Sequence, residues 1–156
     1  MKRKNLRTKI SAHFITRQTK EGKNPLTPKF TRIYYLAHPL TTHGNMTYNR
    51  DHEAYVARKI REQYPDITLL RPLITLSPML SREQALSICD RLLSISDTII
   101  FASDEWRQSK GCMYEYKEAV KQHMQVLQCV ITEDQKIFFN TVTPGSTAPI
   151  RKGARL

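Results

Sequence analysis

The sequence predicts one α/β domain in which a parallel sheet of four to five strands carries helices on both faces. Between residues 31 and 140, short runs of β-branched and aromatic residues alternate with segments of helical period. This alternation is typical of parallel strands joined by helical crossovers, as in flavodoxin-like and Rossmann-like folds. The chain has 156 residues, of which 40% are hydrophobic, so it can bury a core without a metal or disulfides.

The expected elements follow from periodicity and from residues that begin or end helices. Ser81 and Gln84 form a capping box, which predicts a helix start. The apolar stretch 73–80 has no regular period and contains Pro78, so we expect a loop that crosses a pocket. The expected strands are 32–37, 67–70, 97–102 and 125–131, with 136–139 pairing at an edge. The expected helices are 49–64, 81–95 and 111–123.

Positive charge is concentrated at the ends of the chain. Residues 1–32 contain ten of the 25 lysines and arginines and one acid, and the last six residues add three more cations. The net charge of +11 therefore leaves the middle of the chain at −1. We expect a basic arm over 1–30, a domain over 31–140 and a tail over 141–156. The arm is either a nucleic-acid contact or a solvated tail.

Other features of the composition narrow the class of protein. No apolar run is long enough to span a bilayer, and no apolar segment follows the basic start, so we expect a cytoplasmic protein without membrane contact. His38 and His43 lack a third ligand at suitable spacing, which argues against a metal site. The three cysteines are odd in number and widely spaced, as buried small residues would be: Cys89, Cys112 and Cys129.

Polar residues follow the expected strands at the edge where open parallel sheets bind ligands. The segments that reach this edge are 38–48, 71–79 and 103–115. Backbone N–H groups near Ser109 and Gly111, at the start of a helix, predict an anion site. Glu115 follows in the same helix, where it is either a ligand-facing carboxylate or an ordinary glutamate near a helix start.

Four motifs together resemble the nucleoside 2-deoxyribosyltransferase superfamily, particularly its uncharacterised phage and bacterial branch. The most specific is W-x-x-S-x-G-x-x-x-E-x-x-x-A, which extends from Trp106 to Ala119. The others are YLAHPLT at 35–41, Tyr48-Asn49 and Arg71-Pro72, and Asp97 precedes the third strand at the expected spacing. The resemblance covers residues 33–131.

The resemblance implies cleavage of an N-glycosidic bond in a nucleoside or nucleotide, with another base or water as acceptor. Glu115 would attack the anomeric carbon or stabilise its positive charge, and Tyr35 would position the sugar or the glutamate. The resemblance also implies a homo-oligomer, and it implies neither a metal nor an organic cofactor. The candidate substrate-binding residues are His38, Pro39, Thr41, Asn49, Pro72, Trp106, Ser109 and Gly111, with Ser109 as a phosphate contact and Trp106 either a base-stacking or a packing residue.

Two positions depart from the family pattern. His38 replaces the usual glycine before Pro39, and Cys89 stands where the catalytic aspartate is usual. Asp90, the next residue, is the candidate acid, but one helical step turns a side chain by about 100°. Two other interpretations therefore stay open. The domain is a non-catalytic nucleotide-binding module, or the protein binds nucleic acid through residues 1–32.

Overall fold

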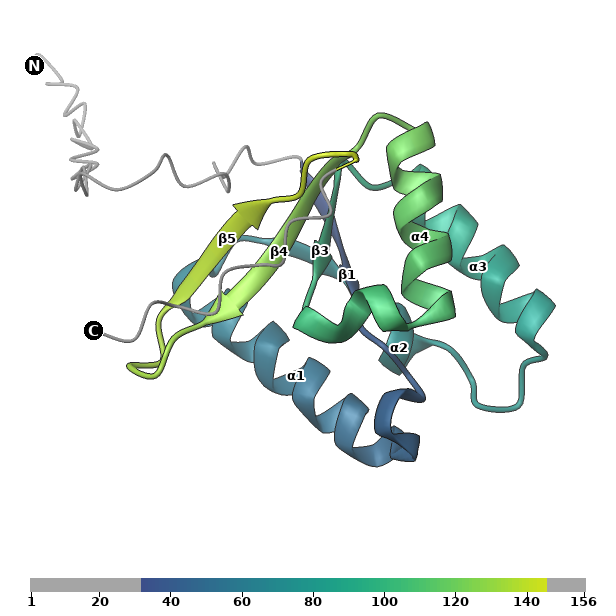
Figure 1. Ribbon diagram of the computed structural model, residues 1–156, viewed down its shortest axis with the longest axis horizontal. Helices are drawn as coiled ribbons and strands as arrows, with labels where there is room; N and C mark the ends of the chain where they lie inside the picture. The colour runs from purple at the N-terminus through teal and green to yellow at the C-terminus, as the bar shows by residue number, and fades with distance from the viewer. Residues whose placement is uncertain (1–31, 146–156) are drawn as a thin grey trace, which may run out of the picture.

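The computed structural model describes residues 32–145, which form a five-stranded sheet flanked by helices (Figure 1). The predicted basic arm and residues 146–156 of the predicted tail lie outside the described residues. The strand order is β2-β1-β3-β4-β5. The strands are β1 (Ile33–Ala37), β2 (Thr68–Leu70), β3 (Thr98–Phe101), β4 (Gln125–Ile131) and β5 (Ile137–Thr141).

The sheet is mixed, which corrects the prediction of a parallel sheet. Strands β1 to β4 are parallel, whereas β5 runs antiparallel to β4, with Cys129 opposite Phe139. The reason is the short connection between β4 and β5, where Gln135 has a positive φ of 64°. Such a turn closes a hairpin but is too short for a parallel crossover. The predicted edge pairing of this last segment is confirmed.

The helices agree with the sequence in number and order, with one addition. The long helices are α1 (Met46–Gln63), α3 (Arg82–Ser94) and α4 (Lys110–Lys121), with 3₁₀ turns η1 (Thr42–Gly44) and η2 (Asp104–Gln108). The Ser81–Gln84 capping box is present at the start of α3. The stretch predicted as a loop begins with one helical turn, α2 (Pro72–Thr75), which Pro72 opens as an N1 residue.

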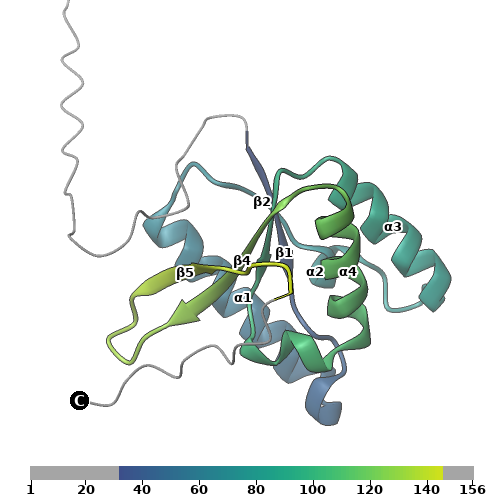
Figure 2. The ribbon, with the colours of Figure 1, turned by 45° about the horizontal axis from the view of Figure 1, so that its top comes forward.

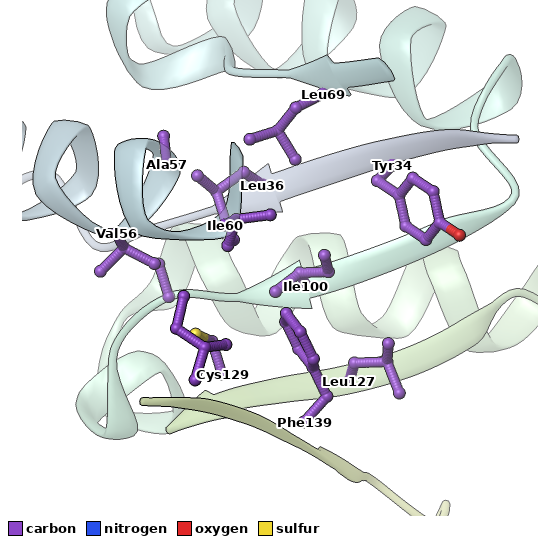
Figure 3. Close-up of a cluster of buried hydrophobic side chains, with 12 residues drawn as sticks. Tyr34, Leu36, Val56, Ala57, Ile60, Leu69, Ile100, Leu127, Cys129 and Phe139 are labelled. Carbon is purple, nitrogen blue, oxygen red and sulfur yellow. The ribbon is translucent and has the colours of Figure 1, made fainter. Parts of the chain in front are cut away.

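Helices cover both faces of the sheet, as predicted (Figure 2), and a hydrophobic cluster packs against each face. On one face, α1 packs Val56, Ala57 and Ile60 against strand residues that include Leu36 and Ile100 (Figure 3). The second cluster lies on the other face, under α3 and α4, and includes Leu93, Ala119, Tyr35, Ile99 and Phe101. The helices α3 and α4 follow the same direction, so both N-termini lie at the carboxyl edge of β1 and β3.

A buried ion pair fixes the segment after β2 against α1. The carboxylate of Glu53, on α1, has no exposed surface and accepts two hydrogen bonds from Arg71, at 2.9 Å from Nε and 2.7 Å from Nη2. Two parallel bonds of this kind hold a guanidinium in one orientation. The pair thereby places α2, which begins at the next residue, beside the carboxyl end of β1.

Candidate functional site

A cavity of about 440 Å³ opens at the carboxyl edge of the sheet. This volume is in the range of small-molecule sites in proteins. Its walls come from the end of β1, the start of α1, α2 with the loop that follows it, and the facing sides of α3 and α4. Apolar side chains dominate the walls, and the charged side chains that line it are Arg50, Arg82 and Glu115.

Glu115 reaches the cavity from the second turn of α4, a helix whose N-cap Ser109 accepts a hydrogen bond from the Cys112 N–H. The carboxyl group is buried and accepts a hydrogen bond from the Tyr35 hydroxyl, at 2.6 Å to Oε1. Tyr35 comes from the middle of β1 and has no exposed surface. The Tyr35 phenol therefore holds the carboxyl of a residue that also lines the cavity.

Burial raises the pKa of Glu115 to about 7. The hydrogen bonds from Tyr35, Cys89 and Cys112 act in the opposite direction, and the nearby charge of Asp90 adds a small raising effect on the pKa. Near neutral pH the carboxyl is therefore populated in both its protonated and its ionised form. A carboxyl with this property can take or give a proton, or act as a nucleophile, without a large change in pH.

Two buried thiols flank Glu115. Cys89 comes from α3 and Cys112 from α4, and both line the cavity. Burial raises the pKa of Cys89 to about 11 and raises the pKa of Cys112 further. Both thiols are therefore neutral hydrogen-bond donors rather than thiolate nucleophiles. All three cysteines are buried and free, as predicted.

Cys89, and not its neighbour Asp90, borders the cavity. Asp90 Oδ2 accepts a hydrogen bond of 2.9 Å from the Tyr114 hydroxyl on α4, and its Oδ1 is buried without a partner among the described residues. The step of about 100° between consecutive helical residues separates the two side chains. The predicted acid Asp90 therefore lies outside the cavity lining, close enough to influence the Glu115 pKa but turned toward Tyr114.

His38 also lines the cavity, and a hydrogen bond joins it to a second histidine. Its Nδ1 lies 2.7 Å from the Pro39 carbonyl, which accepts only, so Nδ1 carries the proton and Nε2 accepts from His52 Nδ1 at 2.8 Å. Burial lowers the pKa of both histidines. At neutral pH both rings are uncharged, and the cavity wall after β1 includes the His38 imidazole.

The remaining predicted site residues divide into two groups. Those that line the cavity are Thr41, Pro72, Ser109 and Gly111. Pro39, Asn49 and Trp106 do not line it. Asn49 instead holds the loop after β1 through hydrogen bonds of 2.8 Å to the Leu40 and Thr42 carbonyls. Trp106 is 1% exposed and stacks on Phe101 with 4.0 Å between ring centroids, so it packs in the core.

Sequence reasoning missed both arginines of the cavity wall. Arg50 directly follows the Tyr48-Asn49 motif, and Arg82 opens α3 at a helix start where a cation is unfavourable. The position of Arg82 could have indicated an anion site from the sequence, because the helix dipole disfavours an arginine at a helix start unless an anion compensates. Within residues 32–145, no group of three or more His, Cys, Asp or Glu side chains is placed to hold a metal.

The fold and the cavity define an α/β protein with a buried carboxyl group at the wall of a cavity. The chain belongs to the family described as a domain of unknown function, DUF4406, whose model matches residues 32–128. A comparison with curated proteins gives no match. The resemblance to nucleoside 2-deoxyribosyltransferases stays a prediction.

One similar solved structure is the crystal structure of a conserved protein from Enterococcus faecalis V583. Its TM-score is 0.52 at 16% sequence identity, and the match covers 63% of this chain and 62% of that chain. At this identity the likeness shows the fold alone. Within residues 32–145, none of the helices has the length and hydropathy that a membrane span requires.

Proposed function

We propose that this protein cleaves or exchanges the N-glycosidic bond of a deoxynucleoside or a deoxynucleoside 5′-monophosphate. The observation that carries the proposal is the Glu115 carboxyl, which borders the cavity and is held by the Tyr35 hydroxyl at 2.6 Å. Cleavage of a glycosidic bond needs an anionic group beside a carbon that becomes positively charged. The ionised Glu115 carboxylate at the cavity wall would supply this group.

In the proposed reaction the bond between the anomeric carbon and the base nitrogen breaks, and its electron pair leaves with the base. The ionised Glu115 carboxylate forms a bond to that carbon or stabilises its positive charge. Water or a second base then bonds to the carbon and restores free Glu115. The departing base takes one proton, for which the cavity wall offers the neutral Cys89 thiol rather than a second carboxylic acid, and the incoming water or base returns a proton to that thiol.

A second function, non-catalytic nucleotide binding, is favoured by one observation. Cys89 occupies the cavity wall where the family resemblance implies an acid, and Asp90 is bonded to Tyr114. A cavity that has lost its proton donor would retain a ligand without turning it over. Recognition of nucleic acid through residues 1–32, assembly into a homo-oligomer and a cytoplasmic location stay predictions.

The test is incubation of the full-length protein with all common deoxynucleosides and their 5′-monophosphates, with free base measured by chromatography. We expect release of base from at least one compound. Addition of a second, different base then distinguishes the acceptors. A new nucleoside or nucleotide indicates transfer, and free sugar alone indicates hydrolysis. If no compound releases base while at least one binds, the non-catalytic function holds and the enzymatic proposal is wrong.

A further inference from the structure

Arg50 lines the cavity without an acidic partner. Within residues 32–145 its guanidinium forms neither a hydrogen bond nor an ion pair, and its Nε is buried without a partner. A buried guanidinium N–H that has lost water without gaining a hydrogen-bond acceptor destabilises the empty protein, and in Arg50 this N–H is the Nε–H. An anionic ligand would supply that acceptor.

The nearest candidate partner on the same helix is already used. Glu53 lies three residues after Arg50 on α1, within the range of side-chain pairs in a helix. Both of its carboxylate oxygens, however, are bonded to Arg71. Arg71 thus satisfies Glu53 completely and leaves Arg50 as an unpaired cation at the cavity wall.

Arg82 adds a second unpaired cation to the same cavity. It is the first residue of α3, where the helix dipole opposes a positive side chain and attracts an anion. No ion pair or hydrogen bond from its side chain occurs within residues 32–145. With two guanidinium groups against one Glu115 carboxyl of pKa about 7, the cavity carries net positive charge near neutral pH.

Arg82 and the reacting carboxyl lie at different levels along α3. Arg82 precedes Cys89 by seven residues on α3, about 10 Å along the helix axis. Cys89 donates a hydrogen bond to Glu115, so the carboxyl lies close to the level of Cys89 along this helix. A ligand that reaches both positions therefore has an uncharged part near Glu115 and an anionic part several bonds away, toward the start of α3.

We infer that Arg50 and Arg82 form a phosphate site that selects the 5′-monophosphate over the uncharged nucleoside. This inference rests on the proposed function, because it assigns the glycosidic carbon to Glu115 and the phosphate monoester to the two guanidinium groups. It concerns other residues than the anion site predicted at Ser109 and Gly111, which line the same cavity. Guanidinium groups bind phosphate through paired, charge-assisted hydrogen bonds, which a helix start alone does not provide.

The test is calorimetric titration of the full-length protein carrying Glu115→Gln, which prevents turnover. The three probes are the four deoxynucleoside 5′-monophosphates, the matching deoxynucleosides and inorganic phosphate. We expect at least one monophosphate to bind about 30-fold more tightly than its nucleoside, the size expected for charge-assisted bonds. Adding Arg50→Gln should reduce this preference to about threefold. Arg58→Gln, an exposed change on the same helix, should leave it unchanged.

Each other outcome has a separate meaning. Equal binding of nucleoside and monophosphate, or a preference that Arg50→Gln preserves, overturns the phosphate site and leaves the proposed function standing. Binding of inorganic phosphate that depends on Arg50, without binding of any nucleoside or nucleotide, overturns the proposed function and supports an anion site. If Arg50→Gln fails to fold in a thermal scan, the exposed Arg82→Gln replaces it, with the same expected direction.

Discussion

Replacing Glu115 with glutamine is expected to lower the rate of base release by about 1000-fold or more. Glutamine keeps the size of the side chain and can still accept the Tyr35 hydrogen bond, so the wall of the cavity is retained. It removes the negative charge that the proposed transition state needs. Initial rates from the chromatographic assay, with folding checked by circular dichroism, measure the effect.

The matched control is Glu118→Gln, on the same helix. Glu118 is a partly buried glutamate that contacts Lys121 at 3.3 Å, and it does not line the cavity. We expect this variant to release base at close to the rate of the unchanged protein. If Glu115→Gln releases base at a rate within about tenfold of the unchanged protein, the carboxylate is not the reacting group.

Replacing Arg71 with leucine is expected to destabilise the fold by about 3–5 kcal/mol, because it leaves a buried, unpaired Glu53 carboxylate. The side chains are 14% and 0% exposed, so water cannot take over the role of the guanidinium. The cavity wall formed by α2 should loosen as well, since Arg71 immediately precedes it. Urea unfolding followed by circular dichroism measures the free energy of unfolding.

An exposed pair on the same helix provides the comparison. Arg58 and Glu62 are 61% and 50% exposed at 3.3 Å, and Arg58→Leu should change the free energy of unfolding by less than about 1 kcal/mol. The double change Arg71→Leu with Glu53→Met should recover much of the stability, because no charge then remains buried. Equal effects of Arg71→Leu and Arg58→Leu would contradict the role assigned to the buried pair.

The sequence predicts those parts of the fold that local patterns specify. The strand 125–131 has the bounds of β4, and the hydroxyl and amide of Ser81 and Gln84 form the predicted capping box. The start of α1 is three residues earlier than expected, because the Asn45 side chain caps the helix through the Tyr48 N–H. The single turn of α2 is too short to show a period, so the stretch that follows Pro72 was expected to be a loop.

The site is less predictable, because its charged groups are defined by contacts between distant segments. Glu53 looks like an ordinary surface residue of an amphipathic helix, yet Arg71, from the segment after β2, buries it. Arg50 becomes notable only because that same contact leaves it unpaired. The separation of Cys89 from Asp90 was foreseeable, since it follows from the geometry of one helix. The partner of Asp90, Tyr114, was not, because it comes from the packing of α3 on α4.

The most direct test of the central claim is the pH dependence of kcat/KM for base release, compared between the unchanged protein and Tyr35→Phe. The reaction needs ionised Glu115, so the rate should rise with pH through an apparent pKa of about 7. The Tyr35 hydrogen bond lowers the pKa of Glu115, so its loss in Tyr35→Phe should move the rise to higher pH. If the rise in rate came from ionisation of a substrate phosphate or of His38, its pH would not shift in Tyr35→Phe. A rise in rate that stays at the same pH in Tyr35→Phe would contradict the claim that the Glu115 carboxylate carries the chemistry.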